Sequence, residues 1–153
     1  MLIIDTSKTK WCDADHQIFN AYVRDADGWG FITCCKYSTG TAGKIWDMRE
    51  ELDIIPADNE QTDEALIKLV QISIQQRLDY VASLKEYDDS VSIMSYLGST
   101  DPTFKAQAEK FNAWRDACWA TARKIREDVK AGKIARPTYA EVMEEIPDFS
   151  WDD

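Results

Sequence analysis

The sequence has few of the residues from which catalytic and metal sites are built. It has one histidine in 153 residues, and no two of its cysteines have the CxxC spacing of zinc or redox motifs. The glycine-containing stretch at residues 38–44, STGTAGK, lacks the spacing and the GK[ST] end of a phosphate-binding loop. We therefore expect no cofactor and four free thiols, at Cys12, Cys34, Cys35 and Cys118.

Long apolar runs and an excess of basic residues are also missing. No stretch approaches the roughly 20 apolar residues of a membrane span, and residues 2–10, LIIDTSKTK, do not resemble a signal peptide. Eighteen basic residues face 28 acidic ones, which gives a formal charge of −10, and residues 1–61 and 62–153 carry −5 each. This balance argues against binding to nucleic-acid phosphates. We expect a soluble cytosolic protein that binds neither membrane nor nucleic acid directly.

Metal-ligand residue types occur near the N-terminus without a complete motif. The segment DADGWG at residues 25–30 has no third ligand before its glycine and no later glutamate, as a calcium loop requires. A single histidine also argues against histidine-rich zinc sites. We therefore interpret the ligand-type residues of this region as solvated turn residues and not as metal ligands. They are Asp13, Asp15, His16, Asp25 and Asp27.

A catalytic pair between His16 and Cys34 or Cys35 is the weakest alternative. No local nucleophile motif accompanies it, and neighbouring residues of a strand point to opposite faces. We expect no enzymatic activity.

The first 37 residues have the composition of β-structure. Residues 2–4, 17–24 and 29–37 are rich in β-branched and aromatic side chains, and Asp27-Gly28 is a hairpin turn signal. A loop at 38–44, a short helix at 45–52 anchored by Trp46 and Met48, and an acidic linker at 57–61 are expected to follow.

Helical periodicity dominates the remainder. Residues 62–87 carry a stripe of Ile67, Val70, Ile74, Leu78 and Val81, and residues 101–131 carry a longer one. Both ends of the longer helix are marked, because Asp101 is a good N-cap, Pro102 suits the first helical position and Gly132 suits the exit. A short helix or turn at 88–98, with Val91, Met94 and Tyr96 facing inward, should fold the two helices against each other.

A short helix after Pro137 should close the chain. Thr138 and Glu141 have the spacing of a capping box, and Phe149 and Trp151 are expected to fold back. The sequence thus predicts an α+β protein with two parts. A small β-hairpin unit and linker occupy 1–61, and an antiparallel helical hairpin with a short capping helix occupies 62–153.

Arg115 is the charged residue in the apolar stripe of the long helix. It is either an anion-binding or catalytic arginine or, in the favoured interpretation, a structural one bridging to Asp79, Asp88 or Asp89 and stacked on an indole. If it is buried, its replacement by alanine should cost about 3 kcal/mol.

Six tryptophans are many for this length. Tryptophan is enriched in interface hot spots, so those outside the core are candidate partner contacts. We expect partner binding at Trp29, Trp46 and Trp151.

The C-terminal part resembles a helical module of tail-region proteins of tailed bacteriophages, including tail fibre and tail-fibre-assembly proteins. The resemblance covers residues 62–151 and rests on QQRLDYVA at 75–82, YDDSVSIMSYLGST at 87–100, PTFKAQAEKFNAWRDACWA at 102–120, DVKAGKIARPT at 128–138 and IPDFSW at 146–151. It implies a structural or assembly module without catalytic residues. Its implied fold-defining positions are Trp114, Arg115, Asp116, Trp119 and Gly132.

The resemblance implies a phage tail structural or accessory protein, in the virion tail or in the host cytoplasm during assembly. Its partners would be other tail or fibre proteins or a second copy of itself. The alternative is a small acidic phage inhibitor of a host nucleic-acid-binding protein, which the charge of −10 suggests.

Overall fold

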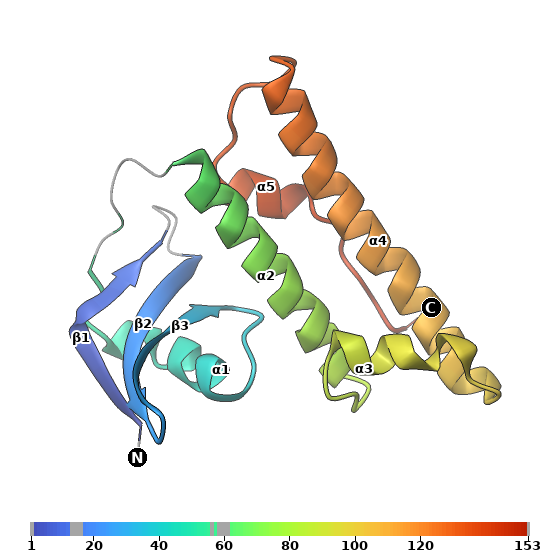
Figure 1. Ribbon diagram of the computed structural model, residues 1–153, viewed down its shortest axis with the longest axis horizontal. Coiled ribbons are helices and arrows are strands. Elements are labelled where there is room, and N and C mark those ends of the chain that lie inside the picture. The colour runs from blue at the N-terminus through green and yellow to red at the C-terminus, as the bar shows by residue number, and fades with distance from the viewer. Residues whose placement is uncertain (1, 13–16, 56, 58–61, 153) are drawn as a thin grey trace. The chain divides into compact units, whose positions relative to one another are not determined.

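The structure is a computed structural model that describes residues 2–12, 17–55, 57 and 62–152. It confirms a mixed α+β architecture, in which a three-stranded antiparallel sheet precedes the helices (Figure 1). The chain divides into two compact units, Met1–Leu69 and Val70–Asp153. The division falls inside a helix, whereas the sequence suggests a boundary between residues 61 and 62. The expected acidic linker at 57–61 lies outside the described residues except for Ala57.

The first unit is built on a meander of strands β1 (Ile3–Trp11), β2 (Ile18–Asp25) and β3 (Gly28–Cys35). Ala26 and Asp27 turn the chain between β2 and β3, and Gly28 follows with φ 117°, a value that only glycine adopts readily. β1 is longer than the expected strand at 2–4, and its register against β2 shifts between Asp5 and Lys10. This irregularity concealed the strand, because its side chains do not alternate cleanly.

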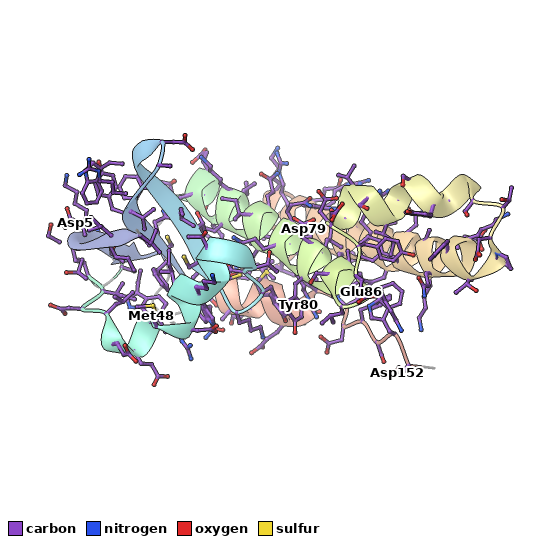
Figure 2. The ribbon with its side chains drawn as sticks, turned by 90° about the horizontal axis from the view of Figure 1, so that it is seen from below. Asp5, Met48, Asp79, Tyr80, Glu86 and Asp152 are labelled. Atoms are coloured by element: carbon purple, nitrogen blue, oxygen red, sulfur yellow. The ribbon has the colours of Figure 1, made fainter. Side chains whose placement is uncertain are left out.

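Helix α1 (Gly40–Asp47) and a short 3-10 turn, η1 (Arg49–Glu51), follow the sheet. The helix begins inside the stretch expected to be a loop, so that prediction was wrong. Ile45 of α1 joins a buried cluster with Phe19, Ala21, Val23 and Cys34 from one sheet face. Trp46 packs beside it as expected, but Met48 is exposed and lies outside this cluster (Figure 2).

The second unit contains most of α2 (Asp63–Ser83), then α3 (Ser90–Met94), the 3-10 turn η2 (Ser95–Gly98), α4 (Pro102–Lys130) and α5 (Tyr139–Glu145). The carboxylate of Asp79, labelled in Figure 2, accepts hydrogen bonds from the Ser90 N–H and from Gln75, both at 3.0 Å, and so holds the start of α3 against α2. Ile93 is buried in this turn, whereas Val91, expected inward, is 73% exposed.

The ends of α4 are those that the sequence predicts. The Asp101 carboxylate accepts from the Thr103 and Phe104 N–H groups, and Pro102 occupies the first turn. At the other end Gly132 has φ 68°, with Gly132 N–H bonded to the Val129 carbonyl and Lys133 N–H to the Asp128 carbonyl. These two bonds form a Schellman motif, in which the left-handed residue is normally glycine. The capping box of Thr138 and Glu141 is also present at α5.

The closing segment after α5 contacts both α2 and α4. Figure 1 shows it running back between α2 and α4. The Trp151 indole N–H donates to the Val81 carbonyl of α2 at 3.0 Å, and the Trp151 ring stacks on Phe111 of α4 with centroids 6.4 Å apart. The expected fold-back of Trp151 is thus confirmed. The expected direct packing of the two helices on each other was wrong, because α2 and α4 diverge and the closing segment bridges them.

Candidate interaction surface

One face of the sheet carries a cluster of partly exposed aromatic rings. Residues opposite each other in adjacent strands share a sheet face, and the register places Tyr22 opposite Phe31 and Arg24 opposite Trp29. The Tyr22 ring lies 5.2 Å from the Trp29 ring, nearly parallel to it, and 4.7 Å from the Phe31 ring. Trp29 is 46% exposed and Phe31 63% exposed. We call Tyr22, Trp29 and Phe31 the aromatic face.

Positively charged side chains border the aromatic face in a chain that is acidic overall. The Lys8 ammonium lies 4.6 Å from the centroid of Tyr22, in a cation–π contact, and the exposed Arg24 stands beside Trp29 in the register. Asp5 (Figure 2) is opposite Tyr22, but its carboxylate accepts from the Ser7 N–H and hydroxyl at 3.0 and 2.6 Å. Among the side chains that the structure describes, Lys8 and Arg24 thus bring positive charge to the rim, and the carboxylate of Asp5 is engaged locally.

On the inner side of the same sheet, the aromatic residues are packed in the core. Trp46, one of the expected partner contacts, stacks on Phe19 with centroids 5.8 Å apart and lies edge-on to Trp11 at 6.3 Å. It is half-buried and packs against the core cluster. Trp46 thus contributes to the core of the first unit, and its exposed fraction offers less to a partner than Trp29 does.

The other tryptophans singled out from the sequence lie in the second unit. Trp114 is buried, and its indole N–H donates to the Pro147 carbonyl at 2.8 Å while its ring contacts Phe149 at 4.8 Å. Trp151 is half-buried between α2 and α4, as described above, and Trp119 is half-buried on α4. Trp29 is accordingly the most exposed of the three tryptophans expected to bind a partner.

Arg115 does not make the contacts expected of it. Its guanidinium bonds the neighbouring Asp116 carboxylate at 2.9 and 3.2 Å, and its side chain is 34% exposed. The prediction of a bridge to Asp79, Asp88 or Asp89 was wrong. Because the condition of burial is not met, the expected cost of about 3 kcal/mol no longer applies, and exposed pairs of this kind contribute at most about 1 kcal/mol.

The buried arginine of the helical unit is Arg77, which sequence reasoning missed. It is 6% exposed, donates to the Ile146 carbonyl at 3.4 Å, pairs with the Asp148 carboxylate, and lies 5.9 Å from the Trp114 ring centroid. The signal was present in the sequence, because Arg77 is one heptad after Val70 and therefore lies on the apolar stripe of α2. It ties the closing segment to that helix.

The thiols are mostly withdrawn from solvent. Burial raises the pKa of Cys34 to about 12 and that of Cys118 to about 11, and it also raises the pKa of Cys35. These three thiols therefore stay protonated near neutral pH and are weak nucleophiles. Cys12 is only half-buried. The possible catalytic partner His16 and the ligand candidates Asp13 and Asp15 lie outside the described residues, as does the side chain of Asp25.

Within residues 2–12, 17–55, 57 and 62–152, no group of three or more histidine, cysteine, aspartate or glutamate side chains has the geometry to hold a metal ion. None of the helices in this part of the chain has the length and apolar character to cross a membrane.

Searches for similar proteins found no matching family model, no matching curated protein and no matching solved structure. The aromatic face therefore has to be interpreted from its own geometry.

Proposed function

We propose that this protein is a structural or accessory component of a bacteriophage tail that acts by binding another tail protein through the aromatic face. The single observation that carries the proposal is the exposure of Trp29 and Phe31 on a sheet whose other face is packed. The resemblance of residues 62–151 to a phage tail module supplies the biological setting.

The geometry suits a binding role. Each ring is attached to a paired strand of the sheet, and Tyr22 is packed between its neighbours, so the rings lose little conformational freedom when a partner covers them. Aromatic side chains with such rigidity are frequent among residues that dominate binding energy. A cluster of exposed rings also has a solvation cost that burial against a partner removes.

The test is capture of tail proteins of the phage that encodes this chain, with and without the aromatic face. A Trp29→Ala/Phe31→Ala variant should lose at least 2 kcal/mol of binding free energy, or about thirtyfold in affinity. The matched control is Met48→Ala/Leu84→Ala, which removes two exposed apolar side chains outside the face. Equal binding by both double variants would refute the role of the aromatic face.

Mass spectrometry of purified phage particles then separates the two tail roles. A structural component stays in the particle, and an assembly factor is found only in the infected cell. If the wild-type protein captures no tail protein and instead binds a basic host protein in a strongly salt-dependent way, the alternative of an acidic inhibitor replaces the tail proposal.

A further inference from the structure

The two edges of the sheet differ in how they are covered. Figure 1 shows β1 and β3 as the outer strands on either side of β2. Along β1, the Trp11 N–H donates to the Ile55 carbonyl at 2.8 Å and the Ile55 N–H donates to the Thr9 carbonyl at 3.0 Å. Along the outer edge of β3, no segment within the described part of the chain pairs in this way with Trp29 or Phe31.

The direction of the backbone groups in β3 follows from one hydrogen bond in β2. The Tyr22 N–H donates to the Thr9 hydroxyl in β1 at 3.2 Å, so the backbone of Tyr22 faces β1. Its opposite residue Phe31 is therefore in a non-hydrogen-bonded pair, and its N–H and C=O point away from β2. By the same alternation the N–H and C=O of Trp29 also point outward.

The far end of β3 confirms the alternation. Cys35, four residues after Phe31, directs its backbone away from β2, where its N–H donates to the Ser38 hydroxyl at 2.8 Å and its carbonyl accepts from the Ser38 N–H at 2.9 Å. The following loop thus satisfies the outward groups of Cys35. The outward groups of Trp29 and Phe31 have no hydrogen-bond partner among the described residues.

These unpaired groups are complementary to themselves. When β3 of a second copy runs antiparallel with the two Gly30 residues facing each other, Trp29 of each copy faces Phe31 of the other. Each Trp29–Phe31 pair across the contact is then a hydrogen-bonded pair, in which the two residues exchange two N–H···O=C bonds. Every outward N–H and C=O of Trp29 and Phe31 in both copies is thus satisfied. We propose that two copies of this chain associate through such β3–β3 pairing about Gly30, which joins their sheets into one of six strands.

The side chains permit this register. A Cβ on Gly30 would have nothing within 4 Å, so the space around the centre of the contact is open. The rings of Trp29 and Phe31 from opposite copies come together on one face, as cross-strand aromatic pairs do in antiparallel sheets. The contact is isologous and closes as a dimer. The charge of −10 on each copy opposes it, so added salt should strengthen the dimer.

Cysteine cross-linking tests the register directly. In a non-hydrogen-bonded pair the two Gly30 Cα atoms lie about 4.5 Å apart, within disulfide range. A Gly30→Cys variant in a Cys12→Ser background should form a disulfide-linked dimer under mild oxidation, because the other thiols are buried and protonated. The control is Ala26→Cys in the exposed turn before β3, because even the nearer Gly28 Cα would lie about 14 Å from its counterpart. Absence of the Gly30→Cys cross-link, or equal cross-linking of both folded variants, would overturn the proposal.

Light scattering on a second pair of variants separates backbone pairing from ring contact. Phe31→Ala and Phe31→Pro both remove the ring, but only proline also removes the outward N–H while still fitting an edge strand. The wild type should have twice the monomer mass of 17.5 kDa. The proline variant should dimerise about thirtyfold more weakly than the alanine variant, because one hydrogen bond is lost in each copy.

Equal dimerisation of the alanine and proline variants would refute strand pairing. A wild-type monomer would refute the dimer but would leave the tail-binding proposal standing, since both Phe31 variants should lose tail-protein capture equally. Capture of a tail protein by a monomer, abolished by Phe31→Pro only, would show that a foreign strand and not a second copy occupies the edge.

Discussion

The two units use aromatic residues in opposite ways. In the helical unit Trp114 and Trp151 are covered, and each indole N–H bonds a backbone carbonyl of the same unit. In the sheet unit Trp29 and Phe31 stay open to solvent although Trp46 packs inside. Trp114 and Trp151 of the helical unit thus make their hydrogen bonds and ring contacts within the chain, whereas Trp29 and Phe31 leave ring surface exposed. The comparison teaches that the position of the rings, and not their number, identifies a candidate binding surface.

The difference between packed and solvent-exposed tryptophans predicts unequal effects of the same substitution to alanine. Trp114→Ala should destabilise the helical unit by about 3–5 kcal/mol, because it leaves a cavity and an unpaired Pro147 carbonyl. Trp29→Ala should change the free energy of unfolding by less than about 1 kcal/mol, since most of what it loses is exposed surface. Urea unfolding followed by circular dichroism measures both. Similar costs at the two sites would break the comparison.

A second pair of variants compares the two arginines of the helical unit. Arg77→Ala should cost about 3 kcal/mol, because it removes the hydrogen bond to Ile146, the pairing with Asp148 and the packing of a buried stem. Arg115→Ala should cost less than about 1 kcal/mol, because its partner Asp116 is its exposed neighbour. Thermal melts of the two variants decide the matter. An Arg115 variant that melts below the Arg77 variant would restore the role that the sequence assigned to Arg115.

Sequence reasoning succeeded where the controlling interactions are local. The N-cap at Asp101, the exit at Gly132 and the capping box at Thr138 each depend on residues within one turn, so their residue types alone predict them. The same holds for the hairpin turn before Gly28. Mixed α+β architecture follows from the change of apolar period along the chain.

It failed where distant segments decide the outcome. Arg77 and Arg115 both interrupt apolar stripes, and only the return of the closing segment makes Arg77 the buried one. The irregular register of β1 depends on its pairing with β2, and no local pattern shows it. Likewise, composition cannot distinguish the exposed Trp29 from the packed Trp46. The strand register places Trp29 on the open face of the sheet, and the packing of α1 places Trp46 against the other face.

The helical unit also contains two helix ends that differ in the residue that adopts the left-handed backbone conformation. α2 ends in the same hydrogen-bond pattern as α4, with Glu86 N–H bonded to Ser83 and Tyr87 N–H to Ala82, but Glu86 has φ 65° (labelled in Figure 2). A side chain in this conformation is strained. Glu86→Gly should therefore stabilise the unit by about 0.5–1 kcal/mol, and Gly132→Ala should destabilise it by about 1 kcal/mol. Chemical denaturation measures both signs, and a destabilising Glu86→Gly would refute the strain.

The smallest expected effect is a pH dependence at the end of α4. Hydrogen bonds from Lys124 and Lys133, at 2.6 and 3.3 Å, lower the pKa of Asp128 below its ordinary value of 3.8. A carboxyl whose pKa is lower in the folded state stabilises the fold above its ordinary pKa, and that contribution fades as the pH falls through the lowered value. The same bond, together with the Asp128 charge, raises the pKa of Lys124 above 10.5, so its contribution is present below that pH and fades above it.

Asp128→Asn tests this assignment. The stability difference between wild type and variant should be constant from about pH 5 to pH 9, should shrink at both extremes, and should diminish in high salt because the groups are near solvent. A difference that does not shrink as the pH falls would mean that Asp128 acts through packing and not through its charge. The helix end would then be stabilised by that packing and by the Schellman motif at Gly132, without a contribution from the lysine–carboxylate pairs.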